Sequence, residues 1–211
     1  MKTKTEKIVL EINNKKDEIV LASVTLFAEK GYTETTIKDI AKAVSLKTAS
    51  LYNYFPSKKS ILELILDIYD EYLEMASMEL DDLKDNFVEM DVKTIIMSTF
   101  SKFPEDENNI YPKILKIILQ EQYRNERIHI YMRDNIFTNL ERKLEVLLNK
   151  MVKKGKIQPI DTKRYAKLMN YTAIAAAVEY CHYTAEEYAT TQTITQFELL
   201  ELIADAILQK K

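Results

Sequence analysis

The segment at residues 36–58, TIKDIAKAVSLKTASLYNYFPSK, constrains the fold most, because it predicts two short helices joined by a tight corner. The Thr36 hydroxyl can cap the first helix, and Asp39, three residues later, completes the spacing of a capping box. Ser45-Leu46 interrupts the apolar periodicity and marks the corner. The second helix is then expected to run from about Lys47 to Phe55. Two helices in this arrangement predict a helix-turn-helix that reads DNA.

The second helix of this pair has two different faces. Leu51 and Phe55, four residues apart, form an apolar inner stripe. Pro56 ends the helix, because the residue before a proline disfavours helical geometry. The opposite face is small or able to form hydrogen bonds, as a helix in the major groove requires. The residues expected to face the groove are Thr48, Ala49, Ser50, Tyr52 and Asn53.

A second set of side chains is expected to hold the DNA backbone. Ser57 can cap the helix that follows, and Lys58 lies at the positive end of that helix, where a phosphate can dock. The full set is Thr36, Lys38, Lys47, Tyr54 and Lys58. The segment therefore predicts a double-stranded DNA operator as a partner.

The pattern at residues 27–62, FAEKGYTETTIKDIAKAVSLKTASLYNYFPSKKSIL, resembles the DNA-binding domain of the tetracycline-repressor (TetR) family. Its marks are Gly31-Tyr32, Thr36, Ile40-Ala41, Leu51-Tyr52, Tyr54-Phe55 and Ser57-Lys58. The resemblance implies an all-helical homodimer whose larger C-terminal domain binds a small molecule that releases DNA. Two positions depart from the pattern. Ser45 stands where glycine is usual, at a cost of roughly 1 kcal/mol, and Lys47 stands where a hydroxyl usually caps the helix, at a cost of about 1 kcal/mol.

Composition supports an all-α fold. The 211 residues include only two glycines and four prolines, and Gly31 and Gly155 both follow predicted helices, as C-terminal glycines do. Asp161 and Thr195 are expected N-caps, and 188–193 is expected to be a loop. Besides the two helices of the motif, helices are predicted over 14–30, 58–80, 91–103, 110–126, 128–154, 162–187 and 195–210, with a break in the acidic stretch 81–91. The predicted division is a basic arm at 1–13, a DNA-binding domain at 14–73 and a ligand-binding and dimerisation domain at 74–211.

Charge and cysteine content bear on the partners and the location. The net charge is −3, but residues 1–60 hold 11 Lys and Arg against 7 Asp and Glu, so this part carries +4 and the remainder −7. A basic module on an acidic body suits a protein that approaches phosphates with one end. The single Cys181 allows no internal disulfide, and no apolar run has the length of a membrane span or the form of a signal peptide. We expect a cytoplasmic protein without a membrane partner or a cofactor.

Tyrosines of the C-terminal half are the candidates for binding the effector. Within the resemblance, the helices around the usual ligand cavity supply Tyr123, Tyr165, Met169, Tyr171, Tyr180 and His182. The far half of the helix predicted at 58–80 adds Tyr69, Tyr72 and Leu73. Glu179 is a carboxylate on a mostly apolar helix, where it can pair with a cationic ligand. These positions therefore predict a small apolar or cationic-amphipathic effector, although each tyrosine is also compatible with a core position and Glu179 with a solvent-facing one.

Small residues predict where two subunits meet. The segment 171–178, YTAIAAAV, allows another helix to approach closely, and the apolar stripe of the helix at 195–210 can be its partner. The small residues expected in this contact are Ala173, Ala175, Ala176 and Ala177, and an arginine at Ala176 is expected to clash within it. The resulting four-helix interface would give a two-fold dimer on a pseudo-palindromic operator. Packing within one chain is the alternative for the same residues.

Two other functions stay open. Glu126/His129 and Glu179/His182 both have the Glu-x-x-His spacing that helical di-metal carboxylate proteins use. The remaining glutamates form no partner stripe on two other helices, so we expect no metal site and no enzyme. The second alternative is a DNA-binding or interaction module whose C-terminal domain binds no ligand.

Overall fold

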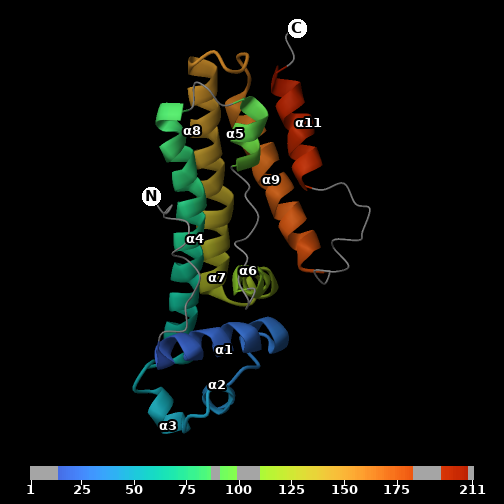
Figure 1. The fold of residues 1–211 in the computed structure, drawn as a ribbon. Coiled ribbons are helices and arrows are strands. Elements are labelled where there is room, and N and C mark those ends of the chain that lie inside the picture. The colour runs from blue at the N-terminus through green and yellow to red at the C-terminus, as the bar shows by residue number, and fades with distance from the viewer. Residues whose placement is uncertain (1–13, 87–90, 99–109, 183–195, 209–211) are drawn as a thin grey trace. The chain divides into compact units, whose positions relative to one another are not determined.

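The computed structural model describes residues 14–86, 91–98, 110–182 and 196–208, and every regular element in these ranges is a helix. The all-α prediction is confirmed for this part of the chain. The chain divides into two compact units (Figure 1). Unit 1 comprises Met1–Leu73 with Phe103–Ile128, and unit 2 comprises Glu74–Lys102 with His129–Lys211. Unit 1 therefore holds a segment from beyond residue 100 that the predicted division assigned to the C-terminal domain.

Unit 1 surrounds the predicted DNA-reading motif. Its helix α1 begins after Asn14, whose side chain accepts from the Lys16 N–H at 2.8 Å, and ends at Gly31 with φ +91°. Helix α6 packs along α1, and Phe27, Ile114 and Ile118 are buried. The elements are α1 (Lys15–Lys30), α2 (Ile37–Ala43), α3 (Thr48–Leu51), the first part of α4 (Lys58–Asn86), α6 (Ile110–Glu121) and the start of α7 (Glu126–Tyr131).

Helix α4 is longer than the sequence predicted. It starts as expected after Ser57, whose Oγ accepts from the Ser60 N–H at 3.1 Å while the Ser60 Oγ accepts from the Ser57 N–H at 3.2 Å. It continues to Asn86, so the predicted end near residue 80 and the start of the break at 81 were wrong. Acidic residues alone do not end a helix, because glutamate and aspartate lack the backbone restraint of proline.

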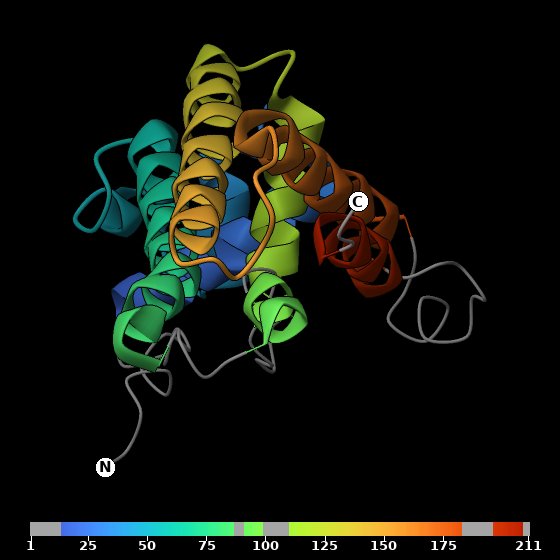
Figure 2. The same ribbon diagram turned by 90° about the horizontal axis from the view of Figure 1, so that it is seen from above.

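Unit 2 is built on α8, α9 and α11, with α5 beside α11 (Figures 1 and 2). Its core includes Leu148, Met151, Met169 and Leu200, all fully buried. The elements are the remainder of α4 and α7, α5 (Val92–Ser98), η2 (Met132–Asn139), α8 (Leu140–Lys153), α9 (Thr162–Tyr180) and α11 (Gln196–Leu208). In α9 the predicted N-cap is confirmed, because the Asp161 side chain accepts from the Arg164 N–H at 3.1 Å.

The helix predicted at 128–154 is interrupted by a π-helical stretch, η2. The amide of the fully buried Asn170 on α9 donates to the carbonyls of Ile136 and Phe137 at 3.1 and 3.2 Å, which satisfies backbone groups in this wider helix. The predicted N-cap Thr195 and the predicted loop 188–193 lie outside the described residues. Among the helices described, none combines the length and apolarity that crossing a membrane requires.

Candidate nucleic-acid interface

Helix α2 begins with the capping box that the sequence predicts. The Thr36 Oγ1 accepts from the Asp39 N–H at 3.2 Å, and the Asp39 carboxylate accepts from the Thr36 N–H at 2.9 Å. The carboxylate also accepts from the Thr36 hydroxyl at 2.6 Å. These hydrogen bonds, the hydroxyl first, hold the pKa of Asp39 below its ordinary value. The start of α2 is therefore set by neighbours in sequence.

The corner between α2 and α3 lies at the predicted position. Ser45 has φ 56°, and it is the one non-glycine residue with positive φ in the described part of the chain. The following Leu46 N–H donates to the Ala41 carbonyl at 2.8 Å, which closes the corner over the end of α2. A side chain is thus held in the left-handed region where relatives of this motif usually have glycine, and some strain is expected.

The second helix of the motif is much shorter than predicted. The α-helix spans only Thr48–Leu51, and the Asn53 and Tyr54 N–H groups bond three residues back, at 3.2 and 2.9 Å. Lys47 supplies no side-chain cap, as its identity implied. The predicted extent of 47–55 was wrong as α-helix, because the last turn tightens before Pro56. The inner stripe is confirmed, since Leu51 and Phe55 are buried.

The face predicted for the DNA bases is open to solvent. Thr48, Ala49 and Asn53 are exposed, Ser50 is half-buried, and Tyr52 is 51% exposed. Of the residues predicted to hold the backbone, Thr36, Lys38, Lys47 and Tyr54 are also exposed.

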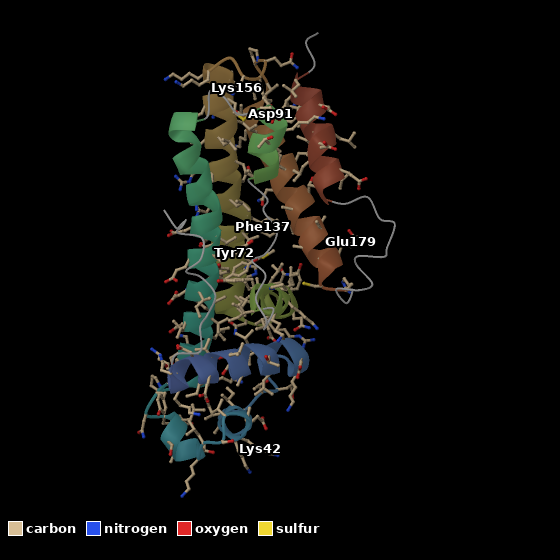
Figure 3. The ribbon with its side chains drawn as sticks, in the orientation of Figure 1. Lys42, Tyr72, Asp91, Phe137, Lys156 and Glu179 are labelled. Carbon is tan, nitrogen blue, oxygen red and sulfur yellow. The ribbon has the colours of Figure 1, made fainter. Side chains whose placement is uncertain are left out.

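The exposed Lys42 at the end of α2 was not chosen from the sequence (Figure 3). Its spacing of four from Lys38, which places both on one helix face, was the signal available. The exposed lysines Lys38, Lys42 and Lys47 thus flank the corner with positive charge.

Lys58 is the exception among the predicted contacts. Its half-buried ammonium donates to the carbonyls of Tyr32 and Thr35 at 2.7 and 2.8 Å and to that of Thr33 at 3.3 Å. It also lies 4.3 Å from the centroid of the Tyr32 ring. Desolvation lowers the pKa of Lys58, and the Glu121 charge opposes that shift. The phosphate contact of Lys58 stays a prediction, and a phosphate would compete with these three acceptors.

The predicted effector residues of unit 1 lie in contrasting surroundings. Tyr69 and Tyr72 are buried, and the Tyr72 ring lies 4.7 Å from that of Tyr111, centroid to centroid. Leu73, the last residue of this part of the unit, is half-buried. Tyr123, just after α6, is 87% exposed. In the described structure the two buried tyrosines are core residues and Tyr123 is a surface residue.

The remaining predicted effector residues belong to unit 2. Met169 is fully buried in the core, and Tyr165 packs against that core. Tyr171 is 47% exposed and meets the Phe137 ring edge-on at 6.1 Å. Glu179 is half-buried near the end of α9 (Figure 3). His182, just after α9, is exposed, and the Tyr180 side chain lies outside the described part. The nine predicted residues whose side chains are described are thus divided between core, surface and half-buried positions of two units.

The described residues give no support to the di-metal alternative. Among them, no three or more His, Cys, Asp or Glu side chains gather closely enough to hold a metal ion. Glu126 and His129 are both exposed on α7.

The exposed polar face, the capped α2 and the corner define unit 1 as a helix-turn-helix protein of the DNA-binding class. Residues 19–65 match the family described as "Bacterial regulatory proteins, tetR family". The match confirms the resemblance for residues 19–65, the part of the chain that carries the motif.

Two curated relatives each match about a third of the chain. The Staphylococcus aureus "Biofilm operon icaADBC HTH-type negative transcriptional regulator IcaR" is 51% identical over 63 residues, which are 30% of this chain and 34% of the relative. The Rhodococcus jostii "HTH-type transcriptional repressor KstR2" is 36% identical over 74 residues, 33% of this chain and 36% of the relative. The chain thus spans about a third of the length of these relatives.

Solved structures match over nearly the whole chain at low identity. A TetR transcription regulator from Haloarcula marismortui gives a TM-score of 0.67 at 20% identity, covering 92% of this chain and 98% of that one. The ketosteroid transcriptional regulator KstR2 of Mycobacterium tuberculosis gives 0.65 at 16% identity, covering 97% and 100%. At this identity the match shows the fold alone.

Proposed function

We propose that the protein is a DNA-binding transcriptional regulator of the repressor type. The observation that carries the proposal is the exposed face from Thr48 to Tyr54, held outward by buried Leu51 and Phe55 and flanked by exposed lysines. Small and hydrogen-bonding side chains at such a face can reach base edges, while lysines neutralise phosphates. IcaR and KstR2, to which about a third of the chain is similar, are by name a negative regulator and a repressor.

The proposal includes a two-fold dimer through α9 and α11. On α9, Leu168, Tyr171 and Val178 are exposed apolar residues, and Leu199 and Leu202 form a corresponding stripe on α11. A shallow groove of about 380 Å³ runs between the two helices, lined by Tyr165, Leu168, Leu202 and Ile203 among others. Continuous exposed apolar surface of this kind is typical of a protein interface. A second copy of the chain would also place a second reading helix on the operator.

The orientation of α9 determines which of its alanines belong to that exposed surface. Ala176, expected in the subunit contact, is only 7% exposed within one chain, whereas its neighbour Ala175 is exposed. An arginine at Ala176 would therefore disturb the interior of unit 2 before it reached a partner. Leu168 and Leu202 are the better positions to test the dimer.

A small-molecule effector is the third part of the proposal. The Glu179 carboxylate would provide a charge for an amphipathic cation, whereas the Tyr171 ring already has the Lys167 Nζ at 5.3 Å from its centroid. Residues of both units belong to the continuous helix α4, so we propose that α4 carries the signal, with Leu73 as a coupling residue. An effector would act only through different affinities for two conformations. In coupled systems an effector typically changes affinity by about 5–150-fold. Leu73→Ala is expected to make this change in operator affinity smaller, without changing the affinity measured in the absence of effector.

The experiment for DNA recognition is selection from a pool of random DNA duplexes with the full-length protein. The expected result is enrichment of a pseudo-palindromic sequence whose affinity falls linearly with the logarithm of salt concentration. A scrambled duplex of equal composition is the control. Recovery of unenriched sequence, with equal affinity for the scrambled duplex, would contradict the proposal.

The effector is tested separately, with tetraphenylphosphonium as the probe cation. We expect it to raise the melting temperature of the wild-type protein and to do so less in Glu179→Gln. Equal shifts in both proteins would contradict the role of Glu179, and no shift in either would contradict a cationic effector.

A further inference from the structure

Glu121 is a buried carboxylate to which the proposed function assigns no role. It ends α6, is 5% exposed, and its Oε1 accepts from the Tyr32 backbone N–H at 3.0 Å, across 89 positions of sequence. Its Oε2 is buried and has no hydrogen-bond partner in the described part of the chain. Burying a carboxylate is costly unless hydrogen bonds compensate. The buried position of the Glu121 carboxylate therefore indicates a structural role.

Gly31 makes room for this carboxylate. A Cβ built at Gly31 would lie 3.3 Å from the Glu121 Oε1, closer than side chains usually pack. The positive φ of +91° is a second reason for glycine at this position. The turn after α1 thus combines an unusual backbone conformation with the close approach of a charged group from α6.

Lys58 holds the other side of the same residue. The Tyr32 N–H donates to Glu121, while the Tyr32 carbonyl accepts from the Lys58 ammonium at 2.7 Å. We name this arrangement of Glu121, Tyr32 and Lys58 the Tyr32 clamp. Hydrogen bonds with a charged partner are about twice as strong as neutral ones, so the clamp restrains the turn from two directions.

The clamped turn leads directly into the reading motif. The Thr35 hydroxyl donates back to the Gly31 carbonyl at 2.8 Å, and Thr36, the next residue, caps α2. Displacing Tyr32 would therefore move the start of α2, and the tight corner would pass that movement to α3.

We infer that Glu121 is a positioning residue for DNA reading: by holding Tyr32, it makes operator affinity depend on a side chain of α6, outside the helix-turn-helix. This inference rests on the proposed DNA-binding function. It assigns α6 to the reading unit in function as well as in packing.

Full-length variants test the inference, with the duplex selected by the wild-type protein as the probe. Glu121→Ala should weaken binding by about tenfold, equivalent to one hydrogen bond to a charged group. Because Glu121 carries no positive charge to a phosphate, the salt dependence should keep its slope. Glu121→Gln retains an acceptor oxygen but loses the charge, so its affinity should fall between those of the wild type and Glu121→Ala.

Lys113→Ala is the matched control. Lys113 makes another polar contact from α6 to α1, with its Nζ 3.4 Å from the Thr25 Oγ1, away from the turn. Its removal should leave operator affinity within about twofold of wild type, because this long, part-buried contact does not involve the turn at Tyr32. Should Glu121→Ala not fold, Glu121→Asp carries the test, because the shorter side chain keeps the charge but loses the reach.

Amide hydrogen exchange of Tyr32 gives a readout that needs no DNA. Exchange should be fastest in Glu121→Ala, slowest in the wild type and intermediate in Glu121→Gln. Wild-type affinity in Glu121→Ala, or in Glu121→Asp where that variant replaces it, would overturn the inference whatever the exchange rate. Equal loss in Glu121→Gln and Glu121→Ala would overturn it as well. A wild-type protein that selects no duplex would instead refute the proposed function, while the exchange result would still report on the clamp.

Discussion

The exposed surfaces of the reading motif in unit 1 and of α9 and α11 in unit 2 differ in chemistry. The first presents Thr48, Asn53 and exposed lysines, and its apolar residues turn inward. The second exposes Leu168 and Leu202, at 50% and 63% of their surface. Exposed polar groups suit a wet, charged partner such as DNA, whereas exposed leucines are stabilised by a dry partner. The comparison teaches that two surfaces of one chain can suit different kinds of partner. The exposed residues of each surface indicate which kind.

Sequence identity to other proteins also differs between parts of the chain. A stretch of 63 residues is 51% identical to IcaR, and residues 19–65 match the family model, while structural matches over nearly the whole chain share 13–22% identity. Reading DNA requires particular side chains at particular positions, because hydrogen bonds to bases are directional. Packing helices requires only apolar residues of suitable size in the right phase. Residues 19–65 are therefore recognisable by sequence and the remainder chiefly by fold.

The largest expected effect is on the apolar surface of unit 2. Leu202→Arg would place an unpaired charge in the proposed subunit contact, at a cost of about 3–5 kcal/mol. We expect the dimer dissociation constant to rise by a factor of roughly 100 or more, as measured by sedimentation equilibrium. Val146→Arg is the control, because Val146 is likewise exposed, at 46%, but lies on α8. A Leu202→Arg protein that remains dimeric would remove the proposed role of this surface.

The next effect distinguishes two roles within the polar surface of unit 1. Asn53→Ala should relax the preference at one base position by about 1–3 kcal/mol. Lys47→Ala should instead weaken binding to all duplexes alike and reduce the slope of log affinity against log salt by about 1. Lys167→Ala, which removes an exposed lysine from unit 2, should change neither quantity. Competition binding with single-base variants of the selected duplex measures the first effect, and a salt titration measures the second. An unchanged base preference in Asn53→Ala would exclude that residue from readout.

A smaller effect is expected at the corner of the motif. Ser45→Gly should raise the free energy of unfolding by up to about 1 kcal/mol, because glycine adopts a positive φ without strain. Ser45→Ala retains a Cβ and is the control for loss of the hydroxyl. Urea denaturation followed by circular dichroism measures both variants. Equal stability of Ser45→Gly and Ser45→Ala would mean that the corner stores no strain.

The smallest expected effect is a pH dependence at the capping box of α2. The pKa of Asp39 is lowered in the folded protein, so its stabilising contribution is present above the ordinary value of 3.8 and is lost as the pH falls through the lower folded value. Asp39→Asn should therefore melt below the wild type near neutral pH, and the difference should shrink in acid. Thr36→Val, which removes the hydroxyl partner, should weaken this pH dependence. A difference between the two proteins that is constant with pH would contradict the linkage.

The local features of unit 1 could be predicted because they depend on near neighbours. The capping box at Thr36 and Asp39, the corner at Ser45 and the N-cap at Asp161 involve partners within a few positions. Hydrogen bonds over such short separations are encoded by residue type and spacing. The length of α3 was missed, because the choice between an α-turn and a tighter turn before Pro56 is a small energy difference that spacing does not reveal.

Residue pattern alone thus determined the all-helical class, the position of the reading motif and most helix starts. Only the tertiary structure decided that Glu121 reaches Tyr32, that Lys58 turns to three carbonyls, and that Ala175 rather than Ala176 is exposed. The physical reason is that periodicity specifies which residues share a helix face, whereas the direction of that face depends on contacts between segments far apart in the chain. Those contacts form only when the helices pack.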